Sequence, residues 1–184
     1  MKSEKVVLSL DPSGNFNEGK GTTGWCVSNN GYIFSAGQIP ASDYKDQMTY
    51  WKAVLNIICK YWKQPHTEFT LVVEDYRLYA SPSKAQINSN LETPQLIGAI
   101  KFYCYINNIP LHLQMASEVK TRWSNEILLE EGIVSKGARG NYHCGKIELS
   151  NHSMDALRHN VHYTTFKNKK REPKNKEKQE YARY

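Results

Sequence analysis

Short apolar runs alternate with polar, glycine-rich turns near the start of the chain. Residues 5–10, 24–28 and 32–37 each form such a run. Runs of this length, bounded by Gly, Pro and Asn, are typical of β-strands. Asn29-Asn30-Gly31 separates the second run from the third, and Asn and Gly tolerate the positive φ angles of a hairpin turn. The pattern predicts three consecutive strands that form an antiparallel meander.

The period of the apolar positions changes between residues 43 and 62, where they recur at steps of three and four. This spacing places them on one face of an α-helix. Residues 69–76 form another apolar run, rich in β-branched side chains, which predicts a fourth strand. A strand that follows a strand and a helix needs a crossover connection, so we expect the fourth strand to run parallel to its neighbour.

The second half of the chain predicts three more helices and one more strand. Thr93 is placed to cap a helix that has Pro94 in its first turn, and Ser117 is placed to cap another. The expected segments are a helix from 93, a strand at 109–114, a helix at 118–131, an irregular stretch at 135–148 and a final helix from 150 or 151 to 165. The predicted fold is therefore α/β, with helices flanking a mixed five-stranded sheet in the order β-β-β-α-β-α-β-α-α.

Charge is distributed unevenly along a chain whose overall composition is that of an ordinary globular protein. The net charge is +6, and residues 166–184 carry +5 of it, with six Lys and two Arg against three Glu. We expect one domain over residues 1–165 and a basic tail over 166–184 that is flexible or helical only on binding. Such a tail suits a polyanion such as nucleic acid, and it equally suits a solvated end without a partner.

Cysteine usage and the N-terminal sequence indicate a reducing compartment. None of the four cysteines has CxxC spacing, and a chain of 184 residues does not need disulfide bonds. A zinc site built from His143, Cys144 and His152 lacks the paired-ligand spacing of such sites, so we do not expect one. The apolar run at Val6 is too short for a signal peptide, and no segment approaches the length of a membrane span. We expect a cytoplasmic protein without a membrane partner.

Polar residues that could bind a metal ion or take part in catalysis stand at three places in the predicted elements. Asp11 ends the first strand, and Glu74 lies at the end of the fourth, where the adjacent Asp75 must point to the opposite face. His152 and Asp155 are three residues apart in the last helix, which places both on one side of it. Each has a simpler interpretation: a turn former before proline, a side chain leaving the core, and a polar pair at a helix start.

Taken together, these residues form a set of donors for a hard divalent cation. Carboxylate oxygens suit Mg²⁺ or Mn²⁺, and an imidazole shifts the preference toward Mn²⁺. Two such ions can activate a water and stabilise the leaving oxygen of a phosphodiester. We therefore expect Asp11, Glu74, His152 and Asp155 to converge on two ions. His159, one turn beyond Asp155, is expected either to support a ligand from behind or simply to be half-buried, and the second is favoured. Without metal, repulsion among the carboxylates should leave the site disordered or protonated.

The order of elements and residues resembles the ribonuclease H-like superfamily, more narrowly the RuvC-type Holliday junction resolvases, and most of all their bacteriophage relatives. The resemblance spans residues 5–165 and is carried by an ordered set of short motifs: Leu10-Asp11-Pro12-Ser13, Gly21-Thr22-Thr23-Gly24-Trp25, Val73-Glu74-Asp75, Gly98-Ala99, Val119-Lys120 and residues 152–159. It implies that the two strand acids and two residues of the last helix bind two metal ions. Many relatives have Asp where this chain has His152, so His152 is either a ligand or a proton carrier.

The same resemblance implies contacts with DNA and a symmetric homodimer. It assigns a DNA contact to Lys120 and, through a looser match in a Gly-rich stretch, to Lys136 or Arg139. Arg77 and Tyr79 are placed either to pack a loop or to contact the backbone and stack on unpaired bases. The family resolves four-way junctions as a dimer because two strands must be nicked.

Three functions remain open from the sequence. The first is a Mg²⁺- or Mn²⁺-dependent endonuclease that cleaves Holliday junctions or other branched DNA, in the bacterial host cytoplasm if the chain is phage-encoded. The second keeps the fold and metals but acts on an RNA–DNA hybrid or another phage DNA-processing intermediate. The third is a non-catalytic nucleic-acid-binding protein that uses the basic tail and the Tyr/Arg loop.

Overall fold

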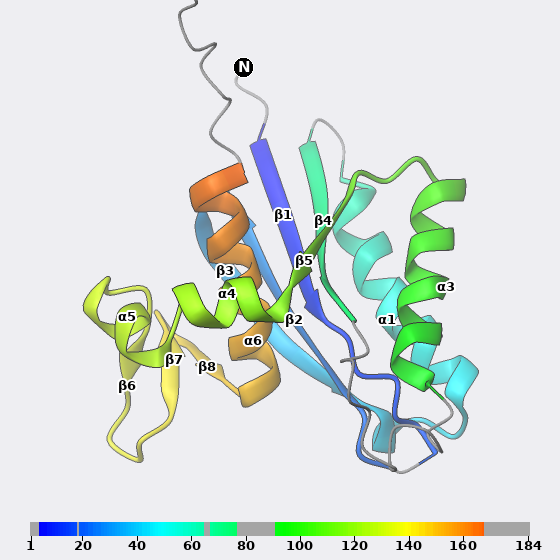
Figure 1. Ribbon diagram of the computed structural model, residues 1–184, viewed down its shortest axis with the longest axis horizontal. Coiled ribbons are helices and arrows are strands. Elements are labelled where there is room, and N and C mark those ends of the chain that lie inside the picture. The colour runs from blue at the N-terminus through cyan, green and yellow to red at the C-terminus, as the bar shows by residue number, and fades with distance from the viewer. Residues whose placement is uncertain (1–3, 18, 65–66, 77–90, 168–184) are drawn as a thin grey trace, which may run out of the picture.

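A mixed five-stranded sheet separates two helical layers in the computed structural model, which describes residues 4–17, 19–64, 67–76 and 91–167 (Figure 1). The strands are β1 (Glu4–Asp11), β2 (Thr22–Asn29), β3 (Tyr32–Pro40), β4 (Thr67–Asp75) and β5 (Leu111–Met115). Their order across the sheet is β3-β2-β1-β4-β5. β1 pairs antiparallel with β2 and parallel with β4, and β4 pairs parallel with β5. The predicted α/β fold with a mixed five-stranded sheet is confirmed.

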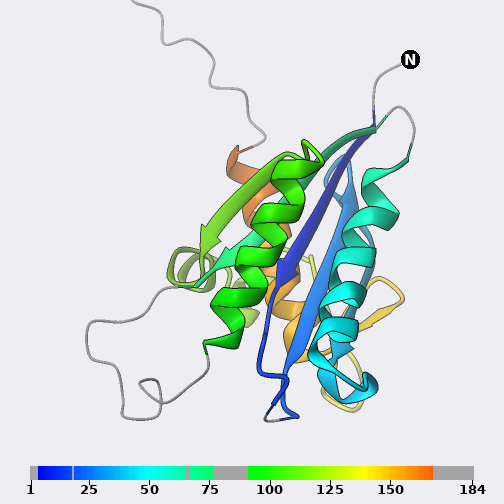
Figure 2. The same ribbon diagram turned by 90° about the vertical axis from the view of Figure 1, so that its right-hand side faces the viewer.

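Helices α1 (Gln47–Trp62) and α3 (Glu92–Ile106) cover one face of this sheet (Figure 2). Alternate side chains of β1, namely Val6, Leu8 and Leu10, are buried in the core beneath them. The short 3₁₀ turn η1 (Ala41–Asp43) precedes α1, so the helix starts later than the apolar period predicts. Its first turn is held by a capping box between Asp46 and Thr49.

The opposite face is covered by α4 (Ala116–Arg122), α5 (Asn125–Glu130) and α6 (Asn151–His162). Buried hydrogen bonds fix α6 on the strands. Ser9 Oγ donates to Ala156 O at 2.7 Å, Ser28 Oγ donates to Asn160 Oδ1 at 2.7 Å, and Asn160 Nδ2 donates to Val7 O at 3.0 Å. A buried polar group left unpaired costs about 1–3 kcal/mol. These bonds therefore specify one position of α6 against β1 and β2.

The start of α3 differs from the prediction. The helix begins at Glu92 after Leu91, which has a left-handed φ of 49°, and Thr93 is not its cap. The Thr93 hydroxyl instead accepts a hydrogen bond from Gly14 N at 2.9 Å. A Cβ on Gly14 would lie 2.1 Å from Glu92 O. Thr93 is thus used to hold the β1–β2 loop against α3, a tertiary contact that helix propensity does not reveal.

The predicted helix at 118–131 is wrong, because the chain forms two helices there. α4 begins at Ala116 without a side-chain cap from Ser117. It ends at Arg122, and the next residue, Trp123, has a buried side chain. Ser124 then caps α5, accepting from Ile127 N at 3.3 Å. A serine side chain that bonds the backbone competes with a continuous helix. The break follows from Ser124 together with burial of Trp123.

The stretch at 135–148 is ordered as a second sheet and is not irregular. It contains β6 (Ser135–Lys136), β7 (Tyr142–Cys144) and β8 (Ile147–Leu149), paired antiparallel in that order. Gly140 and Gly145 make the two turns with φ of 85° and 58°. Strands of two or three residues are too short to show an alternating pattern in the sequence.

The last helix ends earlier than expected and changes character. α6 stops at His162, and a π-helical turn, η2 (Tyr163–Lys167), continues it. The predicted boundary between domain and tail falls inside η2, and residues 168–184 of the tail lie outside the described part. Within the described ranges, no helix is long and apolar enough to cross a membrane.

Candidate active site

Asp11 leaves β1 on the side of the sheet that faces α6. Ser9, two positions earlier, points the same way and bonds α6. The loop that follows Asp11 is fixed by the buried side chain of Tyr50. Its hydroxyl donates to Ser13 O at 2.6 Å and lies 2.7 Å from Thr23 Oγ1. The Asp11 carboxylate is therefore held in place by β1 before it and by this fixed loop after it.

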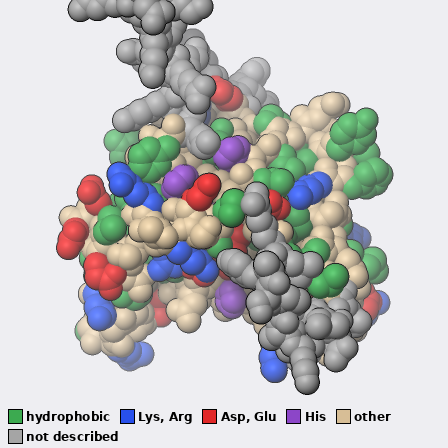
Figure 3. Space-filling model, viewed as in Figure 1, with side chains coloured by type: hydrophobic (Ala, Val, Ile, Leu, Met, Phe, Trp, Pro, Cys, Tyr) green, Lys and Arg blue, Asp and Glu red, His purple; other side chains and the backbone are tan. Residues whose placement is uncertain are grey.

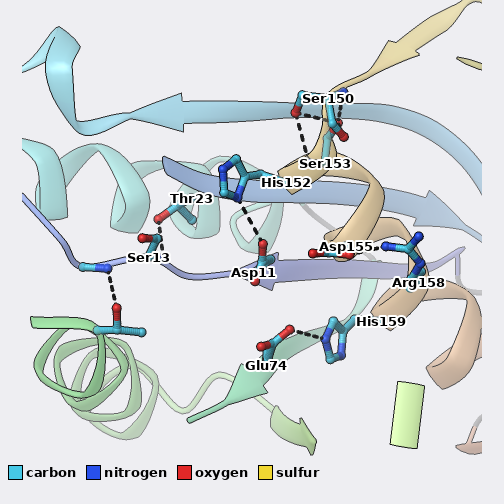
Figure 4. Close-up of polar contacts among 12 residues, drawn as sticks. Asp11, Ser13, Thr23, Glu74, Ser150, His152, Ser153, Asp155, Arg158 and His159 are labelled. Atoms are coloured by element: carbon cyan, nitrogen blue, oxygen red, sulfur yellow. Dashed lines mark hydrogen bonds and ion pairs between the residues drawn. The ribbon is translucent and has the colours of Figure 1, made fainter. Parts of the chain in front are cut away.

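Glu74 and Asp75 point to opposite faces of β4, as the alternation of strand side chains predicts. Glu74 Oε2 lies 2.9 Å from the Nε2 atom of His159 on α6. Asp75 Oδ1 lies 3.5 Å from the Nζ atom of Lys101 on α3. Glu74 therefore shares the α6 face with Asp11 (Figure 4). Asp75 lies on the other face, with Lys101.

The N-terminal end of α6 brings its polar residues against the same strands. Ser150 and Ser153 form a capping box that starts the helix there. A Cβ on Gly24 of β2 would lie 2.0 Å from the carbonyl oxygen of His152. Only glycine permits this approach of helix to strand. Two local sequence features, the capping box and Gly24, thus place His152 and Asp155 beside Asp11.

Each end of this cluster pairs a carboxylate with a basic side chain. His152 Nδ1 lies 3.5 Å from Asp11 Oδ2, and Lys120 Nζ lies 3.1 Å from Asp155 Oδ2. Arg158 Nη1 donates to the other oxygen of Asp155. Figure 4 shows Asp11 at the end of β1 beside His152 and Asp155 of α6, with Arg158 next to Asp155. These basic side chains offset part of the repulsion among the carboxylates.

The pKa shifts show that the three carboxylates share one electrostatic neighbourhood. Burial raises the pKa of Asp11 above 3.8; the hydrogen bond with His152 opposes this, and the charges of Glu74 and Asp155 add to it. The hydrogen bond to Asp11 raises the pKa of His152 above 6.5, against the effect of burial. Burial lowers the pKa of Lys120, but Asp155, helped by Glu74 and Asp11, outweighs burial and raises it.

The side chains of the cluster are of the kind that bind a hard divalent cation, but their present positions do not surround one. Among the described residues, no group of three or more His, Cys, Asp or Glu is placed so that it could hold a metal ion. Lys120 and Arg158 engage both oxygens of Asp155, and His152 faces Asp11. Three neighbouring carboxylates are the oxygen ligands that Mg²⁺ and Mn²⁺ prefer. A metal ion would fit by taking over the positive charge that Lys120 and His152 now supply.

The structure brings five predicted residues into this neighbourhood: Asp11, Glu74, His152, Asp155 and Lys120. Two other predicted residues lie outside the cluster. Lys136 is exposed on β6 of the second sheet, and Arg139 is exposed in the turn that follows β6. Arg77 and Tyr79 lie outside the described residues.

Arg158 belongs to the site, although the sequence pattern did not predict a role for it there. It holds Asp155, and its own position is fixed because Nε donates to Trp123 O at 2.9 Å and Nη2 bonds Asn125. The signal was its spacing of three from Asp155 on a helix, at which opposite charges pair.

His159 is more buried than the sequence predicts, and its contact with Gln114 was not predicted. His159 is fully buried rather than half-buried, and its two ring nitrogens contact Glu74 and Gln114. Gln114 lies opposite Glu74 in the register of β4 and β5. A polar residue in the strand paired with Glu74 was the available signal, but the register that joins them is tertiary.

The chain resembles solved structures, although its sequence matches no protein-family model and no curated protein. A structure of T. thermophilus RuvC in complex with Holliday junction substrate superposes with a TM-score of 0.61 and 14% identity, covering 89% of this chain and 95% of that one. A second Thermus thermophilus RuvC structure gives 0.58 with the same identity and coverage. At this identity the likeness shows a RuvC-like, ribonuclease H-like fold. The bacteriophage type expected from the sequence stays a prediction.

Proposed function

We propose that the chain is a divalent-metal-dependent endonuclease that cleaves branched DNA, with the four-way junction as its preferred substrate. The observation that carries this proposal is the convergence of Asp11, Glu74 and Asp155 from three elements of a RuvC-like fold. Three carboxylates held close together attract cations, and their oxygens are the ligands that Mg²⁺ and Mn²⁺ prefer. The similar T. thermophilus RuvC was solved with a Holliday junction substrate, which supports this choice of substrate.

In this proposal Asp11, Glu74 and Asp155 hold two Mg²⁺ or Mn²⁺ ions. When bound, such ions supply an activated water and stabilise charge on the phosphodiester. The His152 ring is 42% exposed and lies beside Asp11. An imidazole can take up or release a proton near neutral pH, which suits a proton donor to the leaving oxygen. We therefore assign His152 the role of proton carrier rather than permanent ligand.

Basic side chains around the cluster are proposed to contact the DNA backbone. Lys120 is about half exposed and now neutralises Asp155. Once a metal ion takes that carboxylate, the Lys120 ammonium becomes available to a phosphate. Lys136 and Arg139, both exposed on the second sheet and its turn, would extend the contact along the duplex.

A homodimer would supply two nicks, and α3 offers a surface for it. Phe102, Tyr105 and Ile106 are 66%, 81% and 55% exposed on this helix. Figure 3 shows hydrophobic side chains gathered at the upper right, over the end of α3. Around a two-fold axis, these three apolar side chains can meet the same side chains of a second copy.

Substrate choice separates this proposal from the two alternatives. Wild-type protein with Mg²⁺ or Mn²⁺ is compared on a four-way junction, a flap, a linear duplex and an RNA–DNA hybrid of matched sequence. We expect the junction to be nicked fastest, and Asp11→Asn to abolish nicking while junction binding survives. Preferential cleavage of the hybrid would support the second function. Junction binding without any cleavage would support the non-catalytic one.

A further inference from the structure

A buried histidine lies behind the acidic cluster and joins two neighbouring strands. The His159 side chain is fully buried. Its Nε2 atom is 2.9 Å from Glu74 Oε2, and its Nδ1 atom is 2.9 Å from Gln114 Oε1. Glu74 and Gln114 are register partners on the parallel strands β4 and β5, so their side chains lie next to each other on the α6 face. Both ring nitrogens are therefore engaged.

The orientation of the Gln114 amide decides where the ring carries its hydrogen. Gln114 Nε2 is buried and has no hydrogen-bond partner in the part of the chain that the structure describes. The two ends of a glutamine amide have the same shape and are exchanged by a half-turn. That turn lets the amide nitrogen donate to Nδ1 of His159. A neutral ring then carries its hydrogen on Nε2 and donates it to Glu74 Oε2.

A buried polar network of this kind needs a reason, because an apolar side chain of similar size could fill the same space. An unpaired buried polar group is costly, and one end of the Gln114 amide stays unpaired in either orientation. The network engages one oxygen of a carboxylate whose position matters to the site. Hydrogen bonds behind metal-binding carboxylates fix their orientation and are worth about ten- to a hundredfold in affinity.

We propose that His159 is a positioning residue, supported by Gln114, that holds Glu74 by Oε2 and so presents Oε1 to a divalent cation. This rests on the proposed function, since it assumes that Glu74 binds metal. The hydrogen bond occupies one lone pair of Oε2, which favours ligation of the cation through Oε1. It also fixes the orientation of the Glu74 side chain.

Mn²⁺ binding without DNA tests the proposal, and it is followed by titration calorimetry. His159→Leu fills the buried space but removes the donor to Glu74, and we expect Mn²⁺ affinity to fall about ten- to a hundredfold. His159→Gln keeps an N–H at the end of the side chain, and we expect it to recover most of the affinity. His143→Leu, on β7 in the other sheet, is the control and should bind as wild type does.

A second readout needs neither metal nor DNA. Imidazole nitrogen NMR of the metal-free protein should place a hydrogen on His159 Nε2, and Glu74→Gln should shift that signal. This measurement keeps the test valid if His159→Leu fails to fold. An Nε2 atom without a hydrogen overturns the proposal.

The two proposals can fail separately. If His159→Leu binds Mn²⁺ as tightly as wild type, the role of His159 is wrong while the nuclease assignment stands. If wild type cleaves no branched DNA but His159→Leu still weakens Mn²⁺ binding, the nuclease assignment is wrong and the positioning role stands. If His159→Gln binds Mn²⁺ as weakly as His159→Leu, an N–H donor at this position does not restore Glu74, and the positioning role is overturned.

Discussion

His152 Nδ1 lies 3.5 Å from Asp11 Oδ2, which links the last helix to the end of the first strand. The contact shifts the two pKa values in opposite directions, since it raises that of His152 and lowers that of Asp11, where burial has the larger effect. The pair therefore exists in charged form only within a window of pH. Its lower limit is the Asp11 pKa, which lies above 3.8, and its upper limit is the His152 pKa, which lies above 6.5.

The stability of the metal-free protein should depend on pH through this pair. Because the folded pKa of His152 is raised, its stabilising effect is present below pH 6.5 and is lost as pH rises through the folded value. Protonation of Asp11 removes the partner as pH falls through its own folded pKa. We expect the loss of unfolding free energy in His152→Asn to be largest inside the window. Urea unfolding of both proteins at a series of pH values, with a chelator present, measures this. A difference that does not vary with pH would contradict the pairing.

Lys120 should compete with metal for Asp155. Its Nζ atom lies 3.1 Å from Asp155 Oδ2, and it must leave if a cation binds there. We expect Lys120→Met to bind Mn²⁺ about two- to tenfold more tightly in the absence of DNA, since a competing positive charge is removed. The same variant should bind junction DNA more weakly.

The matched control for that experiment lies on the other face of the sheet. Lys101 and Asp75 form a similar pair at 3.5 Å. Lys101→Met should leave Mn²⁺ affinity unchanged. If both variants behave alike, or if Lys120→Met binds Mn²⁺ less tightly, Lys120 does not hold the place of a metal ion.

Gly24→Ala should displace α6 from the strands. Its Cβ would meet the backbone of His152 at 2.0 Å, and backbone cannot rotate away as a side chain can. Such overpacking costs about 1–3 kcal/mol of unfolding free energy, and we expect cleavage to be lost with it. Gly98→Ala is the control, because its Cβ meets open space within a helix and should stabilise the fold by about 0.5–1 kcal/mol. Equal effects of the two changes in urea unfolding would show that Gly24 is not a contact point.

The proposed dimer can be tested with two equally exposed tyrosines. Tyr105 on α3 and Tyr32 on β3 are both 81% exposed. Sedimentation of the wild type should show a dimer, and Tyr105→Glu should convert it to a monomer by placing a charge in the apolar surface. Tyr32→Glu should remain dimeric. A dimer that survives Tyr105→Glu would remove α3 from the interface.

The parts of the site that the sequence revealed are those that depend on local pattern. Asp11 and Glu74 stand at the ends of apolar strands, and alternation alone assigns Asp75 to the other face. The Asn30-Gly31 turn has the predicted positive φ angles. These features follow from the strand period and from turn chemistry, which act over a few residues.

The parts that the sequence did not reveal depend on contacts between distant residues. Gln114 reaches His159 only because β4 and β5 pair in one register. Thr93 serves the β1–β2 loop because Gly14 can approach α3 closely. Trp123 ends α4 in a conformation that burial favours and helix propensity does not. No local pattern encodes such partners.

The proposed function requires that Asp11, Glu74 and Asp155 share divalent cations. Crystals of the protein grown or soaked with Mn²⁺ test this directly, because the anomalous signal of manganese locates the ions. We expect anomalous peaks within ligand distance of all three carboxylates, with Lys120 turned away from Asp155. Mn²⁺ bound only elsewhere, or a cluster that keeps its Lys120–Asp155 and His152–Asp11 pairs at saturating Mn²⁺, would contradict it.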